Sequence, residues 1–209
     1  MQHKSLKNTL SACTVALFIL LALGSKVNRI HYGAFQYSSS KEDRAEDGHY
    51  LVKNDGEKIH GDKISWKSGL LAKDQIKVDE QKFKITEVKG YRSGSTYYIR
   101  KGNEYIKRIV HGPRINLYVE FTEVTTTSTT NTGFTRTRSY TRTDHYAQKG
   151  EDGPLLPCAG QSDFKKLMED CPLAVEMADL SNKQMRKAIK KNPNYLNSIF
   201  EVYNNGCKE

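Results

Sequence analysis

The residues best suited to do chemistry in this sequence are cations set in a threonine-rich stretch, residues 124–144. More than half of these residues are Thr or Ser, and β-branched Thr favours extended chain over helix. The stretch therefore predicts a long hairpin with its tip near residues 131–133. Side chains of a strand alternate between its two faces. One face of the return strand would carry Phe134, Arg136, Arg138, Tyr140 and Arg142.

A second group of cations lies among tyrosines before this stretch. The cations are Arg100, Lys107 and Arg108, and the tyrosines are Tyr97, Tyr98, Tyr105 and Tyr118. Aromatic faces interleaved with cations are typical of surfaces that bind single-stranded nucleic acid, sugars or acidic polymers. The same pattern also fits a β core with tyrosines inside and cations along its solvated edges. The sequence leaves both interpretations open.

The basic excess of the chain is concentrated in these two groups. The formal net charge is +9, and residues 89–149 hold eleven Lys and Arg against four acidic residues. A surface of this kind attracts an anionic partner over a distance. We therefore expect the binding residues to be Arg100, Lys107, Arg108, Arg136, Arg138, Tyr140 and Arg142.

The cysteines predict one disulfide and one odd thiol. Cys171 opens one helical segment and Cys207 closes the last one, which favours a bond between them. Closing that loop would stabilise the fold by roughly 3–4 kcal/mol on the chain-entropy account. Cys158 is then free, although pairing of Cys158 with Cys171 is an alternative. A free Cys158 with His111 or His145 as base would suit a hydrolase, but no nucleophile signature surrounds it.

Other catalytic and metal-binding signatures are missing from the sequence. Its six histidines are scattered, with no pair at metal-ligand spacing. There is no glycine-rich phosphate loop and no nucleophile elbow. We therefore expect no metal, no cofactor and no enzymatic activity.

The first 24 residues are predicted to be a secretory signal peptide. A basic start containing Lys4 and Lys7 precedes an apolar stretch, residues 10–23, and small residues place the cleavage before Ser25. Fourteen helical residues span about 21 Å, less than the roughly 30 Å of a bilayer core. An uncleaved membrane anchor is the alternative. The polar composition of residues 25–47 predicts a tether that does not pack into a core.

The elements that would position the candidate residues predict an α+β fold. Residues 48–150 show short β-branched and aromatic runs separated by frequent turns, which favour an antiparallel β-rich meander or a small barrel. A Pro/Gly linker at 151–161 follows. Apolar residues then recur at helical spacing through 162–209, which predicts a C-terminal bundle of short helices.

Three short stretches of the sequence resemble a group of known proteins. Residues 48–61 form the opening hairpin, Asp170-Cys171-Pro172 begins a helix, and Glu201-Val202-Tyr203-Asn204 lies near the C-terminus. In these the chain resembles a group of uncharacterised exported proteins of Bacteroidetes. The resemblance implies export and a β-rich body followed by helices.

These observations predict a non-enzymatic module that is exported to the periplasm or secreted. It would bind an anionic polymer or an envelope protein through its basic Tyr- and Arg-bearing β surface. Export makes nucleic acid an unexpected partner, and membrane attachment is expected only if the signal segment is retained. The alternatives are an exported cysteine-dependent hydrolase using Cys158 and a purely structural envelope protein.

Overall fold

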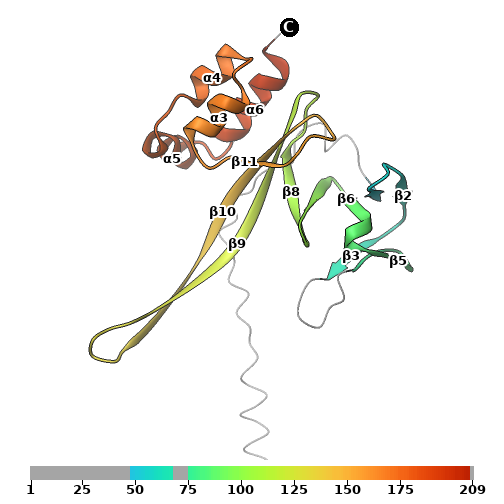
Figure 1. The fold of residues 1–209 in the computed structure, drawn as a ribbon, viewed down its shortest axis with the longest axis horizontal. Helices are drawn as coiled ribbons and strands as arrows, with labels where there is room; N and C mark the ends of the chain where they lie inside the picture. Colours follow the sequence, from blue (N-terminus) through green and yellow to red (C-terminus); the bar gives the residue numbers. More distant parts are fainter. Residues whose placement is uncertain (1–47, 68–74, 208–209) are drawn as a thin grey trace, which may run out of the picture. The chain divides into compact units, whose positions relative to one another are not determined.

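The computed structural model describes residues 48–67 and 75–207, which form two antiparallel sheets and four short helices (Figure 1). The predicted α+β class is therefore confirmed. The predicted signal peptide and tether lie outside the described residues.

The larger sheet has eight strands in the order β11-β10-β9-β8-β7-β6-β1-β2. Its members are β1 (His49–Lys53), β2 (Lys58–His60), β6 (Val88–Ser93), β7 (Thr96–Lys101), β8 (Glu104–Val110), β9 (Ile115–Thr129), β10 (Thr135–Lys149) and β11 (Leu156–Pro157). From β6 to β11 each strand pairs with the next along the chain. Among the described residues the sheet is open, with β11 and β2 at its edges, so it is a meander and not a closed barrel.

The chain leaves this sheet once to build a smaller one. After β2 it turns at Gly61 into β3 (Ile64–Lys67), β4 (Gln75–Val78) and β5 (Gln81–Lys84), which pair in that order. A short 3-10 turn, η1 (Ile85–Glu87), returns it to β6 beside β1. Gly61 is thus the point where the chain changes sheets.

The four helices follow the last strands. They are α3 (Gln161–Leu167), α4 (Pro172–Ala178), α5 (Asn182–Lys191) and α6 (Tyr195–Asn205). Pro172 occupies the first turn of α4, where its missing N–H costs nothing. Ser181 and Gln184 form a capping box at the start of α5.

The tyrosines of the central strands are core residues. Tyr97, Tyr105 and Tyr118 are all buried. Tyr91 and Tyr105 pack with Leu51 against apolar residues of the small sheet, while Tyr97 and Tyr118 pack with Ile99 in a separate cluster. Of the two interpretations of the tyrosines, the β core is correct for these three.

The helices pack on the large sheet through a third cluster, which includes Leu117 and Val119 of β9 and Ile199 and Phe200 of α6. A polar clamp adds to this contact. The Asn204 side chain accepts hydrogen bonds from the backbone N–H groups of Arg114 (3.1 Å) and Ile115 (3.0 Å), and it donates one to the Ile115 carbonyl (3.0 Å). It thereby continues the hydrogen bonding at the start of β9, and fixes α6 there.

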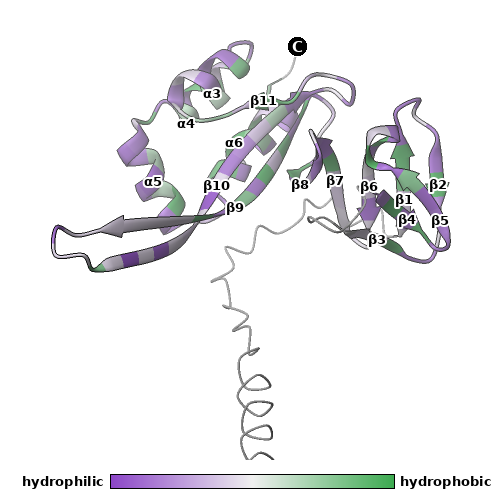
Figure 2. Ribbon diagram, turned by 60° about the horizontal axis from the view of Figure 1, so that its bottom comes forward, coloured by the Kyte–Doolittle hydropathy of each residue, from purple (hydrophilic) through white to green (hydrophobic). Residues whose placement is uncertain are grey.

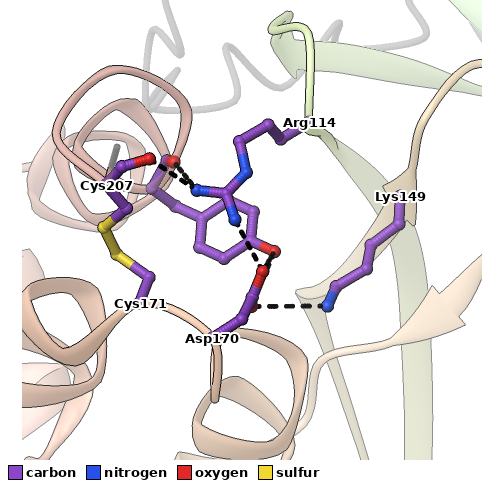
Figure 3. The surroundings of a disulfide bond; sticks show 6 residues. Arg114, Lys149, Asp170, Cys171 and Cys207 are labelled. Carbon is purple, nitrogen blue, oxygen red and sulfur yellow. Dashed lines mark hydrogen bonds and ion pairs between the residues drawn. A yellow bond between two sulfur atoms is a disulfide. The ribbon is translucent and has the colours of Figure 1, made fainter. Parts of the chain in front are cut away.

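The side chain of Arg114, whose backbone takes part in this clamp, also bonds to residues of the helical region (Figure 3). Arg114 Nη1 donates to the carbonyls of Tyr203 (3.2 Å) and Cys207 (3.0 Å), and its Nη2 donates to Asp170 (2.6 Å). A disulfide joins Cys171 to Cys207, with their Cα atoms 5.5 Å apart. The predicted pair is thus bonded in the structure, and Cys158 is free.

Candidate binding surface

The longest feature of the fold is the hairpin of β9 and β10, whose fifteen residues on each strand pair throughout (Figure 1). Its inner half is buried: residues 115–120 contribute to the body of the sheet. We call residues 121–143 the distal arm, because almost all of them are exposed. Nine strand residues on each side correspond to about 30 Å of ribbon.

Threonine chemistry holds the arm in register. On one face, hydroxyl groups meet across the strands at Thr125–Ser139 (2.9 Å), Thr127–Thr137 (3.4 Å) and Thr129–Thr135 (3.5 Å). Cross-strand pairs of this kind stabilise an antiparallel ribbon. The tip turns at residues 130–134, with Gly133 in the left-handed region at φ 79°.

The opposite face carries the predicted cations. We call Arg136, Arg138, Tyr140 and Arg142 the arginine face. Their cross-strand partners are Ser128, Thr126, Val124 and Thr122, so no acidic residue stands directly opposite. Purple and pale segments alternate along this part of the ribbon in Figure 2, as expected for Arg and Thr in turn.

The members of the arginine face differ in their neighbours. Arg142 Nε donates to Asp144 (2.7 Å), which offsets part of its charge and raises its pKa. Arg136 and Arg138 are exposed, and within the described residues neither has an acidic partner. Tyr140 is 54% exposed. The face therefore presents two uncompensated guanidinium groups, a third that is partly compensated, and an accessible aromatic ring.

Arg108 lies elsewhere. Its side chain is only 3% exposed, its guanidinium sits 4.3 Å above the centre of the Tyr97 ring, and Nη1 is 3.9 Å from Glu151. A cation buried in this way against an aromatic ring stabilises the sheet. The structure therefore places Arg108 in the interior, not on an open surface.

Arg100 and Lys107 are also separate from the arm. Arg100 donates from Nε to the Val88 carbonyl (2.9 Å), and so ties β7 to β6. Lys107 is half-buried, and burial lowers the pKa of its ammonium group. Both occur at strand positions whose side chains point to the face opposite that of Arg108. The structure thus gathers four of the seven predicted binding residues and disperses the other three.

Cys158 lies in a different place, in a cavity of about 290 Å³ between the sheet and the helices. Its backbone N–H donates to the His145 carbonyl (2.8 Å), because β11 pairs with β10 at this point. The cavity is lined by Cys158 and His145, by polar residues of α3 and α5 such as Gln161 and Asn182, and by apolar residues such as Phe164. The structure therefore places the predicted thiol and one of its two predicted bases in the lining of the same cavity.

The protonation of this pair does not suit nucleophilic catalysis. Burial raises the pKa of the Cys158 thiol to about 12 and lowers the pKa of His145 to about 4. Both groups are therefore neutral at physiological pH. Reactive cysteines need the opposite, a lowered thiol pKa in electropositive surroundings. The other candidate base, His111, bonds to Glu151 (3.2 Å).

Neither metal ligation nor membrane spanning marks the described part of the chain. Within residues 48–67 and 75–207, no three His, Cys, Asp or Glu side chains are grouped to hold a metal ion. No helix in those ranges has the length and apolar character needed to cross a bilayer. No family model matches the chain, and no curated protein or solved structure matches it either. The resemblance to exported Bacteroidetes proteins therefore stays a prediction.

The sequence did not predict two of these features. The Cys158–His145 contact depends on β11, a strand of two residues that ends in Pro157 within the expected linker, and proline is a poor strand signal. The Asn204 clamp joins residues 89 and 90 positions apart. Only its spacing, four residues after Phe200 and next to Tyr203 on the buried stripe of α6, could have marked Asn204 as structural.

Proposed function

We propose that this chain is an exported, non-enzymatic module that binds an anionic polymer of the cell envelope or extracellular space through its distal arm. The observation that carries the proposal is the arginine face. Three arginines and a tyrosine share one side of an exposed ribbon, and two of the arginines have no acidic partner among the described residues.

The chemistry of these side chains suits carboxylate, sulfate or phosphate groups on a chain-like ligand. Arginine presents a planar fork of donors that binds such groups in a bidentate manner. Arg136 and Arg138 are two residues apart, so their Cα atoms are about 7 Å apart along the strand. Tyr140, next along this face, offers a flat surface on which a sugar ring can stack.

Export is the second part of the proposal. The predicted signal peptide supports it, and so does the Cys171–Cys207 disulfide, because such bonds persist mainly in oxidising compartments. Mass analysis of the purified protein tests it: export with cleavage predicts a mature chain that begins at Ser25. A chain that keeps residues 1–24 and remains in the cytoplasm would contradict it.

The binding experiment uses immobilised heparin as a probe of acidic polysaccharide. The variant Arg136→Ala/Arg138→Ala/Arg142→Ala is expected to bind at least tenfold more weakly than the wild type. A matched control removes three exposed lysines of α5, Lys183, Lys187 and Lys190. It lowers the net charge by the same amount and should retain most of the affinity. Equal losses of heparin affinity in both variants would contradict the proposal, since net charge alone would then explain binding.

The same variants on vesicles distinguish a polymer from a membrane surface. We expect weak binding to vesicles that contain acidic lipid, because the two exposed phenylalanines of the arm, Phe121 at its base and Phe134 at its tip, do not form a continuous apolar face. Tight, arginine-dependent vesicle binding with no heparin binding would replace the polymer by a lipid surface.

The alternatives make different predictions. A cysteine hydrolase requires a reactive thiol, and the raised pKa and burial of Cys158 argue against it. A purely structural envelope protein predicts no arginine-dependent binding to any anionic polymer.

A further inference from the structure

The distal arm has two outer edges, and the register shows which backbone groups face them. In an antiparallel pair, closely spaced hydrogen-bonded residues alternate with non-bonded ones, whose side chains approach more closely. The hydroxyl contacts at Thr125, Thr127 and Thr129 mark non-bonded pairs, and the bond from Thr130 N–H to the Phe134 carbonyl marks a bonded one. Odd-numbered residues of β9 therefore point their N–H and C=O groups away from β10.

This outer edge of β9 is open. β8 pairs with β9 only as far as Val119, and within the described residues no strand pairs with the outer edge of residues 124–129. Natural edge strands are usually protected by lysine, proline or a bulge. The segment 124–129 contains none of these and reads Val-Thr-Thr-Thr-Ser-Thr. A two-stranded ribbon standing alone is also only marginally stable in water.

We propose that this edge pairs with the same edge of a second copy of the chain, in an antiparallel arrangement around a two-fold axis at Thr126. The two hairpins would then form one four-stranded sheet in the order β10-β9-β9-β10. In this register Thr125 stands opposite Thr127 of the other copy, and Val124 opposite Ser128. Thr–Thr pairs of this kind are favourable, and the single charged residue nearby, Glu123, meets Thr129.

Charge decides between the two edges of the arm. The outer edge of β10 is also open along the arm, because β11 pairs only with Tyr146 and Ala147. Two copies joined through β10 would bring arginines together. A two-fold axis at residue 138 places Arg138 opposite Arg138 of the other copy. An axis at residue 139 places Arg136 opposite Arg142, and an axis at residue 140 places Arg138 opposite Arg142. Like charges directly opposite one another destabilise a sheet. The neutral β9 edge has no such conflict.

The pairing has a consequence for the arginine face. A two-fold axis perpendicular to the sheet keeps both arginine faces on the same side. Their β10 strands would be three strand spacings apart, about 14 Å. Six arginines would then face one ligand, although the pairing itself does not depend on the proposed polymer binding.

Sedimentation velocity of the purified protein without ligand tests the proposal. Between about 1 and 200 μM we expect a rise to twice the monomer mass, with no larger species. Thr127→Pro removes an N–H group that points outward, and edge strands tolerate proline at such positions. This variant should dimerise at least tenfold more weakly, while its circular dichroism spectrum stays unchanged. Thr137→Pro is the matched change on the outer edge of β10 and should leave the dimer intact. A monomer at every concentration, or a dimer lost only with Thr137→Pro, would overturn the proposal.

A cross-link provides a second test that does not rely on proline. At the two-fold axis the two Cα atoms of residue 126 would form a non-bonded pair about 4.5 Å apart, which is close enough for a disulfide. Thr126→Cys should therefore become a covalent dimer under mild oxidation. Ser128→Cys, whose copies would lie about four residues apart along the strands, should not. Equally fast cross-linking of both variants would contradict the register.

These results separate the dimer from the proposed function. A monomer that still binds heparin through its arginines refutes the dimer alone. A dimer that does not bind heparin refutes the proposed polymer binding alone.

Discussion

The Asn204 clamp gives the sharpest prediction about stability. Asn204→Ala removes three hydrogen bonds that join α6 to the start of β9, and it leaves the N–H and C=O of fully buried Ile115 without these partners. A buried backbone group left unpaired costs about 1–3 kcal/mol. With two such groups, and partial repair by water, we expect the free energy of unfolding to fall by about 3 kcal/mol.

Urea unfolding followed by circular dichroism measures this change. The neighbouring Asn205 is exposed on the same helix, so Asn205→Ala is a matched control and should change the free energy by less than about 0.5 kcal/mol. Asn204→Leu restores the volume of the side chain but not its bonds, and should still cost about 2 kcal/mol or more. A loss below about 1 kcal/mol for Asn204→Ala would refute the reasoning, because the bonds would then contribute little.

Three further predictions concern the cysteines and one histidine. Replacing Cys171 and Cys207 by Ala should lower the free energy of unfolding by about 4 kcal/mol, because the disulfide closes a loop with a sequence separation of 36. A change under about 1 kcal/mol in urea unfolding would contradict this prediction. Iodoacetamide at pH 8 should label Cys158 only after denaturation, because burial raises the pKa of its thiol to about 12. Rapid labelling of the folded protein would contradict this, because it would show that the thiol is accessible. His145 stays neutral in the fold because burial lowers its pKa to about 4, whereas the unfolded chain takes up a proton near the ordinary value of 6.5. Stability should therefore fall by up to about 2 kcal/mol between pH 7 and pH 5, and a His145→Gln variant that keeps the same pH dependence would exclude this cause.

Local patterns predicted most of the fold. β-branched and aromatic runs separated by frequent turns predicted the strands within residues 48–150. Apolar residues at helical spacing predicted the short helices within residues 162–209. These signals lie within a few residues of the structures that they specify, so no tertiary information is needed to read them.

Long-range arrangement was less predictable. The sequence gives no sign that the chain builds a second sheet between β2 and β6, because the strands of both sheets show the same alternation. The arginine face was predictable because strand period alone decides it. The burial of Arg108 against Tyr97 was not, because it depends on packing within the folded sheet.

The salt dependence of heparin binding tests the central claim most directly. For a polyanion, the logarithm of the affinity falls linearly with the logarithm of the salt concentration, and each cationic contact adds up to about 0.9 to the slope. Arg136→Ala/Arg138→Ala/Arg142→Ala should therefore reduce the slope by about 2 to 3, while the triple lysine variant of α5 should leave it unchanged. The same slope for the wild type and the arginine variant would show that the arm does not contact the polymer.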